Sequence, residues 1–304
     1  MGKDTTKTAE AKKAGLKKAR KKYFSFGLAS GLASSNPESP LYKSYTNSKF
    51  CAETITVDPD GMSHSHYCKN RWCPLCQSIR IARLINGYQP QLEQMGELYF
   101  VTLTRPTVPA DQLPGQWKKM SSAFNSIRHS RVFRRNNWSG LRKVECTIRP
   151  NDHYHLHFHV LINSQEGAEF LVKRWLELNP ESDPKAQDIR KVEGEKGYLE
   201  IFKYFTKLIA KIKGKKYERR FISYPRLDVI FQFMRGKRVF QPFGDLHPVE
   251  EDFEDEDLDS EELDRANTIW QWVSSDWYEI STGEAMTGYT PAGSLTNLLE
   301  GKGD

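Results

Sequence analysis

Apolar residues in the middle of the chain follow the spacing of β-strands in several segments. Leu98–Thr104 is a run of apolar, β-branched and aromatic residues, which is typical of a buried strand. Leu141–Ile148 and Tyr154–Ile162 have the pattern of two further strands, and the turn residues of the Arg149-Pro-Asn-Asp loop between them predict a hairpin. Ala186–Val192 has the pattern of a short strand. Together these segments predict an antiparallel sheet.

Helical spacing occurs between and after these strands. Apolar residues recur at intervals of three and four at Trp117, Met120, Phe124 and Ile127. Phe170–Leu178 predicts a second helix, and Tyr198–Ile212 predicts a strongly amphipathic third one. Tyr224–Phe240 alternates enough to predict one or two more strands. Strands joined by hairpins and interleaved with helices indicate an α+β fold with a central antiparallel sheet and flanking helices.

The two ends of the chain differ in composition from its middle. Residues 1–22 are rich in Lys and Ala and predict a frayed or helical basic arm, whereas residues 26–49 are rich in Ser, Gly, Asn and Pro and predict a linker or loop. Near the other end, an acidic run precedes a Trp-rich tail. These shifts divide the chain into an arm with a linker (1–49), a cysteine-rich module with a helix (50–96), a main α+β domain (97–245), and an acidic linker with a tail (246–304).

The net charge is unevenly distributed along the chain. It is +6 for the whole sequence, but Glu250–Asp264 holds 11 acids and no base, so the remainder carries 45 basic against 28 acidic residues, or +17. Such a basic body favours a polyanionic partner, of which nucleic acid is the common one. No apolar run approaches the roughly 18–20 residues that span a bilayer, and no apolar segment follows the basic N-terminus as in a secretory signal. We therefore expect a cytoplasmic protein with a nucleic-acid partner and no membrane partner.

Four histidines share one face of the predicted strand HYHLHFHVLI, because strand side chains alternate between faces; they are His153, His155, His157 and His159. The partner strand of the hairpin places Glu145 opposite His157 or His159. Neutral imidazoles two residues apart, with one carboxylate, can share a divalent cation and leave positions open for a ligand. We expect such an ion at Glu145, His157 and His159, with His155 close by. The competing interpretation is a merely polar face of the sheet.

The cysteines are clustered, since three of the five lie within nine residues. The cluster consists of Cys68, Cys73 and Cys76, with Cys51 upstream. Because cytoplasmic thiols stay reduced, this clustering favours a metal over disulfides, and four thiolates close a structural zinc site. Either His64 or His66 could replace Cys51 as the fourth ligand. Free or redox-active thiols are the competing interpretation.

Taken together, the motifs resemble those of the HUH endonucleases, and specifically the plasmid rolling-circle replication initiators of the Rep_1 kind. The end of the histidine strand, His157–Ile162, is similar to their H-x-H-hydrophobic motif, and Phe100–Thr104 is similar to their threonine-rich strand. Glu200–Tyr204 resembles the E-x-x-K-Y pattern that carries their nucleophilic tyrosine, and Gly236–Arg238 resembles the G-x-R pattern that follows it. The likeness covers about residues 50–245.

This resemblance implies both a fold and an activity. The fold is a five-stranded antiparallel sheet with helices packed on it, an HUH nuclease domain within residues 97–245, beside the zinc module. The activity is metal-dependent nicking and joining of one DNA strand with Mg²⁺ or Mn²⁺, in which Tyr204 forms a 5′-phosphotyrosine and leaves a 3′-OH primer. The implied partners are a plasmid double-strand origin, its single-stranded nick site, and a host helicase and polymerase. The implied DNA contacts are Lys203, Lys207, Arg80 and Arg83.

The residues around Tyr204 can also be considered without the family. On a helix over Tyr198–Ile212, Tyr204 would lie about 100° from the centre of the apolar stripe, which makes it a boundary residue and not a core aromatic. Glu200 lies one helical turn earlier and is a candidate base for activating a water or a second attacking hydroxyl. The alternative for Glu200 is a surface carboxylate that pairs with Lys203 or Lys207.

Two other functions remain open at this point. One is a related enzyme of the same chemistry, an HUH-type relaxase or single-strand transposase; the cysteine module and the single tyrosine favour the initiator. The other is a zinc-dependent DNA-binding regulator without catalysis, which leaves the four-histidine strand and Glu145 unexplained.

Overall fold

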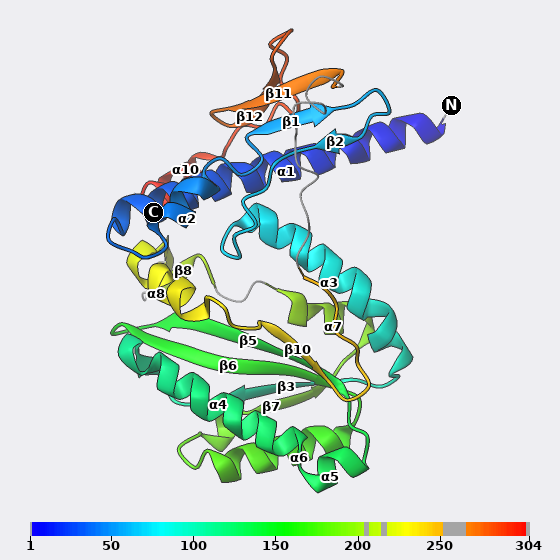
Figure 1. Cartoon of the computed structure of the whole chain (residues 1–304), viewed down its shortest axis with the longest axis vertical. Coiled ribbons are helices and arrows are strands. Elements are labelled where there is room, and N and C mark those ends of the chain that lie inside the picture. The colour runs from blue at the N-terminus through cyan, green and yellow to red at the C-terminus, as the bar shows by residue number, and fades with distance from the viewer. Residues whose placement is uncertain (1, 204–206, 214–217, 252–265, 302–304) are drawn as a thin grey trace. The chain divides into compact units, whose positions relative to one another are not determined.

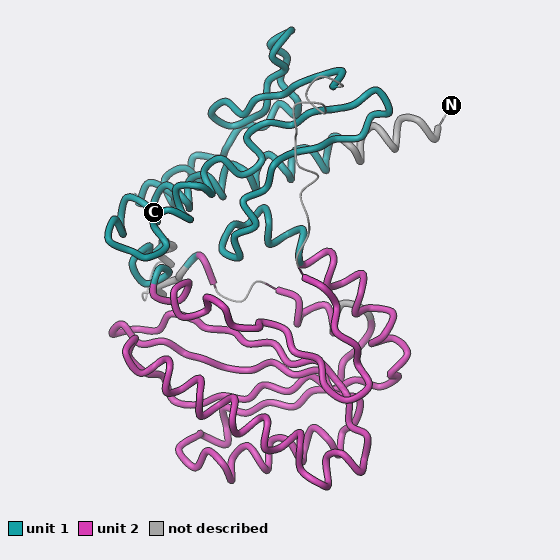
Figure 2. Tube along the Cα trace, viewed as in Figure 1, with its two compact units in different colours: residues 1–80, 209–228, 252–304 teal, residues 81–208, 229–251 magenta. Residues whose placement is uncertain are grey.

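The structure, a computed structural model, describes residues 2–203, 207–213, 218–251 and 266–301. The chain forms two compact units, which Figure 2 distinguishes by colour. Residues 1–80, 209–228 and 252–304 make up unit 1, and residues 81–208 and 229–251 make up unit 2. Each unit is therefore assembled from segments that are distant in the sequence.

Unit 2 is built on an antiparallel sheet with the strand order β10-β5-β6-β3-β7. Its strands are β3 (Tyr99–Thr104), β5 (Gly140–Arg149), β6 (His153–Ile162), β7 (Asp188–Lys191) and β10 (Phe240–Phe243), and the short β4 (Val108–Pro109) also pairs with β6. β5 and β6 form a long hairpin, which turns through Asn151 and Asp152 in left-handed backbone conformations. The α+β fold with a central antiparallel sheet is thereby confirmed.

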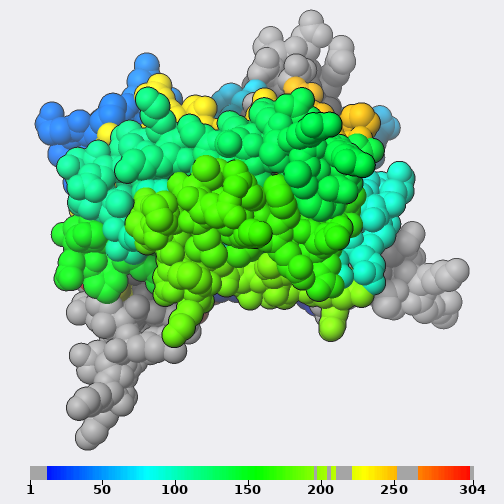
Figure 3. All heavy atoms as spheres, turned by 90° about the horizontal axis from the view of Figure 1, so that it is seen from below, coloured from blue at the N-terminus to red at the C-terminus, as the bar shows by residue number. Residues whose placement is uncertain are grey.

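One face of this sheet is covered by helices, which Figure 1 shows below the strands and Figure 3 views from that side. They are α4 (Leu113–Arg128), α5 (Arg131–Arg135) and α6 (Gln165–Leu178), with short 3₁₀ turns η1 (Ala110–Gln112) and η2 (Pro184–Ala186) nearby in sequence. Phe158 of β6 meets three rings of this layer edge-on, those of Trp117, Phe124 and Trp175. Because side chains alternate along a strand, the buried Phe158 leaves the neighbouring histidines on the opposite face.

The opposite face is partly covered by aromatic packing. The turn η3 (Glu200–Phe202) follows α7 (Gly194–Leu199), and its Phe202 stacks on Tyr88 of α3 (Pro74–Gln94) and on Phe240, with ring centroids 6.1 and 5.7 Å apart. Phe240 pairs with Lys143 in the sheet and therefore shares the histidine face. This packing fixes η3 on that face of the sheet.

Unit 1 combines segments from both ends of the chain around a sheet with the order β12-β11-β1-β2. Its elements include α1 (Gly2–Ser35), α2 (Tyr42–Ser48), β1 (Thr54–Val57), β2 (Ser63–His64), β11 (Thr268–Val273), β12 (Asp276–Glu279) and α10 (Gly293–Leu299). Trp270 of β11 pairs with Ile55 of β1. The Trp-rich tail thus joins the N-terminal and cysteine-rich segments in one unit, whereas the sequence placed residues 1–49, 50–96 and 246–304 in separate segments.

The linker predicted over residues 26–49 is wrong, because α1 continues to Ser35 and α2 follows it. The small residues of this stretch are packing positions. A Cβ on Gly31 would lie 2.1 Å from the ring of Tyr224, and one on Gly27 would lie 2.6 Å from Leu299. Composition misled the prediction because Gly and Ser permit close approach of packed elements as well as a flexible chain.

The amphipathic helix predicted over Tyr198–Ile212 is also wrong. The helical backbone of α7 and η3 ends at Phe202, Lys203 is extended (ψ 160°), and β8 (Ala210–Lys213) pairs with β9 (Glu218–Phe221). The apolar stripe is divided between different partners, because Ile201 and Phe202 are buried in unit 2 while the chain enters unit 1 at Ile209. Tertiary packing therefore overrides the helical period.

The strands predicted over Tyr224–Phe240 are replaced by a helix, α8 (Tyr224–Met234), followed by β10. Its buried residues follow the helical intervals i, i+3, i+4 and i+7, at Leu227, Ile230, Phe231 and Met234. Their β-branched and aromatic character outweighed this spacing in the prediction. Among the helices of the described residues, none combines the length and the apolar character needed to cross a membrane.

Candidate metal centres

The first centre lies on the β5–β6 hairpin of unit 2. The register places Glu145 opposite His157 and Lys143 opposite His159, so the first of the two predicted registers is found. The carboxylate oxygens of Glu145 lie 3.7 Å from Nε2 of His157 and 3.5 Å from Nε2 of His159. One ligand atom from each of these three residues lies within 4.8 Å of the others. The three side chains therefore converge as a metal-binding group would.

His155 lies beside this group but not within it. Its ring stacks on that of His157 at a centroid distance of 4.9 Å, while its Nδ1 lies 3.1 Å from a guanidinium nitrogen of Arg149. His153 contacts the carbonyl of Asn151. Among the described residues, the convergent group consists of Glu145, His157 and His159 alone. His155 thus lies close to the group, as expected, but outside its set of convergent ligand atoms.

Two neighbours orient the ligands. Oγ1 of Thr102 lies 3.3 Å from Nδ1 of His159, which leaves Nε2 of that ring to face Glu145. The ammonium of Lys143 donates to a carboxylate oxygen of Glu145 at 3.3 Å. An imidazole held at one nitrogen presents the other in a fixed direction, which is how metal-binding histidines are commonly supported.

Burial and charge set the protonation of the group. Burial lowers the pKa of His157 to about 3, so the ring is neutral near pH 7 and offers a lone pair. Burial opposes ionisation of Glu145, but its hydrogen bond with His159 and the charge of Lys143 hold the pKa of this carboxyl at about 2. Two imidazole nitrogens and one carboxylate are a donor set that suits a divalent cation. His159 and Glu145 are only partly buried, so the group remains open on one side.

Tyr204, the expected nucleophile, lies outside the described residues. The turn that leads to it is described, and η3 contacts β6. The carboxylate of Glu200 pairs with Arg190 of β7 at 2.5 Å and with Lys203 at 3.3 Å. Burial raises the pKa of Glu200, but the hydrogen bonds from Arg190 and Lys203 together lower it by more, so the pKa lies below its ordinary value. Both Glu200 and Lys203 influence the pKa of Lys143, which places this turn near the sheet face that carries Glu145, His157 and His159.

The second centre is the cysteine cluster of unit 1. The sulfur of Cys51 lies 3.4 Å from that of Cys76 and 3.6 Å from that of Cys73, and Cys68 lies 3.6 Å from Cys76. Sulfur–zinc bonds of about 2.3 Å in a tetrahedron separate the sulfurs by about 3.8 Å. All five cysteines of the chain are free thiols, so no disulfide competes with a metal. The cluster could therefore bind a metal such as zinc, with Cys51 and not a histidine as the fourth ligand.

Both histidine alternatives lie elsewhere. Nε2 of His64 lies 3.4 Å from the carboxylate of Asp58. The carbonyl of His66 accepts a hydrogen bond from the backbone N–H of Ala52. Neither ring belongs to the convergent cysteine group.

The buried surroundings of the cysteines come from α1, which the sequence did not connect with them. The ammonium of Lys22 is buried and donates to the carbonyls of Lys49 and Cys51 at 2.8 and 2.6 Å, and Oγ of Ser25 lies 3.0 Å from the sulfur of Cys73. Burial lowers the pKa of Lys22, while the thiols of Cys51 and Cys73 act to raise it. A cation at this position offsets the negative charge that four thiolates would bring.

The residues expected to contact DNA differ in exposure. Arg83, Lys203 and Lys207 are exposed. Arg80 is buried, with 4% of its surface exposed, and donates to the carbonyl of Lys69 at 2.8 Å. Its place as a DNA contact is therefore contradicted, since the guanidinium supports the loop between Cys68 and Cys73.

Comparison with known proteins places these centres in context. The model of the Rep_1 family, described as a replication protein, matches residues 61–281. A Protein rep of Staphylococcus aureus is 33% identical over 138 residues, which cover 40% of this chain and 59% of that protein. A Protein rep of Lentilactobacillus hilgardii is 28% identical over 133 residues, 40% of this chain and 42% of that protein. The chain thus spans about half the length of these curated relatives. No solved structure matches it significantly.

Proposed function

Since this chain belongs to the Rep_1 family of replication proteins, we propose that it is a rolling-circle initiator that nicks and rejoins one strand of a plasmid origin. The observation that carries the proposal is the convergence of Glu145, His157 and His159 on the sheet face that η3 contacts. That turn leads directly to Tyr204. Cleavage of a phosphodiester requires a metal-binding group and a nucleophile that can reach the same phosphate.

The residues present fit one catalytic and one structural metal. Glu145, His157 and His159 would hold Mg²⁺ or Mn²⁺, and the four cysteines would hold Zn²⁺. A divalent ion held by these three residues would stabilise the charge that develops on the phosphate oxygens. Thr102 keeps the His159 ring in the orientation that binding needs, through its 3.3 Å contact to Nδ1.

In the cleavage step, the hydroxyl oxygen of Tyr204 attacks the phosphorus. The bond between this oxygen and phosphorus forms as the bond from phosphorus to the 3′ oxygen breaks. The tyrosine proton passes to solvent, and the released 3′ oxygen takes up a proton to become the hydroxyl that primes a polymerase. The product is a phosphotyrosine on the 5′ side of the cut. A tyrosine hydroxyl is a poor nucleophile at neutral pH, so this step depends on stabilisation of the phosphate charge.

In the closing step, Glu200 accepts the proton of the second attacking hydroxyl or water. Its carboxylate is ionised at neutral pH because Arg190 and Lys203 pair with it. The same pairing makes it a weaker base than an unpaired carboxylate, since its pKa lies below the ordinary value. We therefore assign Glu200 to the later step and not to activation of Tyr204.

The exposed Arg83, Lys203 and Lys207 supply phosphate contacts with the origin and with its single-stranded nick site. A host helicase and polymerase would act on the nicked product, because the 3′-OH must be extended and the strands separated.

Cleavage of a labelled single-stranded oligonucleotide tests this function. We expect cleavage with Mn²⁺ or Mg²⁺, no cleavage in excess EDTA, and recovery when Mn²⁺ is returned. DNA binding, measured by fluorescence anisotropy, should survive EDTA because Lys and Arg supply the affinity. Zinc content is measured on the same samples, so that loss of the structural metal is not mistaken for loss of the catalytic one. Undiminished cleavage in EDTA with zinc retained would contradict a catalytic ion.

A further inference from the structure

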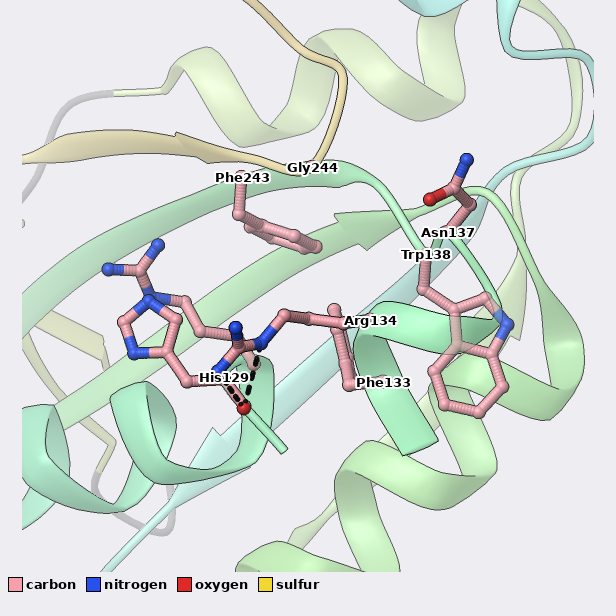
Figure 4. Close-up of a pocket in the computed structure, with 8 residues that line it drawn as sticks. His129, Phe133, Arg134, Asn137, Trp138, Phe243 and Gly244 are labelled. Atoms are coloured by element: carbon pink, nitrogen blue, oxygen red, sulfur yellow. Dashed lines mark hydrogen bonds between the residues drawn. The ribbon is translucent and has the colours of Figure 1, made fainter. Parts of the chain in front are cut away.

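A pocket lies in unit 2, on the helical side of the sheet. It has a volume of about 320 Å³ and is formed where α4 ends, where α5 begins and ends, and where the chain turns after β10. Six of its lining residues carry the argument: Arg128, His129, Phe133, Arg134, Trp138 and Phe243. Figure 4 shows Phe243 facing Phe133 and Arg134, with Trp138 on the far side of Phe133 from His129.

This pocket is positively charged and contains no acid among its lining residues. Arg128 first, then burial and Arg134, lower the pKa of His129, as expected where cations are not offset by carboxylates. The nearest acid in sequence, Asp245, is not part of the lining, and its carboxylate lies 3.4 Å from Oγ of Ser139. An anion in this pocket would meet two guanidinium groups, which match phosphate in geometry.

A further buried cation adds to the same potential. Arg142 of β5 has 2% of its surface exposed, and its guanidinium carbon lies 4.6 Å from the ring centroid of Phe158. Its Nε has no hydrogen-bond partner among the described residues. Burial, and then the charges of Arg128 and Arg238, lower its pKa to about 9. Arg142 therefore adds a buried positive charge close to Arg128, on the helical side of the sheet.

The walls of the pocket are aromatic. Phe133 contacts both Trp138 and Phe243, with ring centroids 5.3 and 5.8 Å apart. Guanidinium groups beside aromatic rings are the combination that binds an unpaired base together with its phosphate. The volume lies at the lower end of the roughly 300–1,000 Å³ of small-molecule sites, which suits one ring system and not a base pair.

The pocket is held in place before any ligand arrives. Oγ of Ser130 accepts the N–H of Phe133 at the start of α5, and Nε and one terminal nitrogen of Arg134 donate to the carbonyl of His129 at 2.9 and 2.6 Å. Gly244 has a φ of +67°, and a Cβ there would lie 2.2 Å from Oγ of Ser139. Only glycine fits that approach, so the turn after β10 packs directly against Ser139.

The pocket and the metal-binding group lie on opposite faces of the sheet. Phe240 shares the histidine face, and Phe243, three residues later on the same strand, points to the other face and contacts Phe124 of α4. A ligand in the pocket would therefore be distinct from a DNA phosphate bound at Glu145, His157 and His159.

We propose that this pocket binds one unpaired nucleotide, with its phosphate on Arg128 and Arg134 and its base against Phe133, Trp138 and Phe243. The nucleotide is either part of a DNA single strand or a free nucleotide, since both present the same base and phosphate. The proposal does not depend on the nicking chemistry.

Binding of dAMP and of a short fluorescein-labelled single strand to the full chain tests the proposal. Arg134→Ala is the main variant, and Arg135→Ala is its matched control, because both arginines are exposed on α5 but only Arg134 lines the pocket. We expect Arg134→Ala to weaken binding about tenfold, the effect of one charge-assisted hydrogen bond, and Arg135→Ala to change it less than about twofold. Arg128→Gln should act like Arg134→Ala, and thermal unfolding confirms that each variant is folded.

The two ligands separate the sources of the nucleotide. Loss of dAMP affinity in the Arg134 variant supports a free nucleotide, and loss confined to the labelled strand supports an unpaired nucleotide of DNA. If neither ligand distinguishes Arg134→Ala from Arg135→Ala, or if inorganic phosphate competes as well as dAMP, the proposal is overturned. If the protein fails to nick DNA but Arg134→Ala still weakens its binding of dAMP, the proposed nuclease function is contradicted and the proposal for the pocket stands.

Discussion

The cysteine cluster of unit 1 and the Glu145–His157–His159 group of unit 2 differ in the type of their ligand atoms and in how far these atoms are enclosed by the protein. Three of the four cysteines are buried, and the sulfurs already have nearly tetrahedral spacing. The second group has three ligands, of which only His157 is buried. Four soft ligands in a closed shell are typical of structural zinc, whereas three nitrogen and oxygen ligands with an open side are typical of a catalytic ion.

The same difference appears in the neighbours of each group. The cysteines are surrounded by the buried Lys22, which holds two backbone carbonyls, and by Ser25. The second group has Thr102 and Lys143, which orient its ligands while leaving one side accessible. Lys22 and Ser25 stabilise the negative charge of buried thiolates. Thr102 and Lys143 instead orient the side chains of a group that a ligand must be able to enter.

The largest effect is expected from Cys73→Ser. Loss of one thiolate should release zinc and destabilise unit 1 by more than about 3 kcal/mol, because structural zinc supplies folding free energy. The matched control is Cys146→Ala, which removes the buried cysteine outside the cluster. Zinc content by mass spectrometry and thermal unfolding measure the outcome. A Cys73→Ser protein that retains zinc and its unfolding temperature would show that the cluster is not a metal site.

A smaller effect on stability, but a complete effect on cleavage, is expected from His157→Ala. Affinity for Mn²⁺ should fall more than about 100-fold. Loss of a residue that only supports a ligand typically lowers metal affinity about 10–100-fold, and loss of the ligand itself should lower it more. His153→Ala is the control, because it lies on the same face of β6 outside the convergent group. Calorimetric Mn²⁺ titration and oligonucleotide cleavage check this. If His157→Ala and His153→Ala lose the same Mn²⁺ affinity and cleavage, the histidines of β6 form only a polar face of the sheet and no specific metal site.

The smallest effect is expected from Thr102→Val, which removes the contact to Nδ1 of His159 and keeps the side-chain shape. Affinity for Mn²⁺ should fall about tenfold, in the range of other supporting residues of metal sites. Thr102→Ser should restore it, because the hydroxyl returns. Unchanged affinity in Thr102→Val would show that packing alone orients His159.

Both candidate metal-binding groups could be predicted from local spacing. Strand alternation places His157 and His159 on one face and Glu145 across the hairpin, because these residues are close in sequence and one turn fixes their register. The cysteine spacing predicts the cluster for the same reason. The contributions of Lys22 and Ser25 could not be predicted, since they come from a helix that only tertiary packing brings to the cysteines.

The errors in the fold arose where tertiary partners decide between alternatives. The apolar residues of Tyr198–Ile212 match a helix, yet the chain leaves helical geometry at Lys203 and pairs as β8 further on. Gly27 and Gly31 suggested a loop, although their missing Cβ atoms make room for Leu299 and Tyr224. In both cases the deciding contact lies far away in the sequence, where spacing carries no information.

Covalent attachment to DNA is the most direct test of the proposed initiator. The protein and its Tyr204→Phe variant are incubated with a labelled single-stranded origin oligonucleotide and Mn²⁺, and DNA-linked peptides are mapped by mass spectrometry. The account predicts a 5′ adduct on the peptide that contains Tyr204, no adduct or nick in Tyr204→Phe, and accumulated adduct in Glu200→Ala, where only closing fails. A Tyr204→Phe protein that still forms the covalent adduct would contradict it.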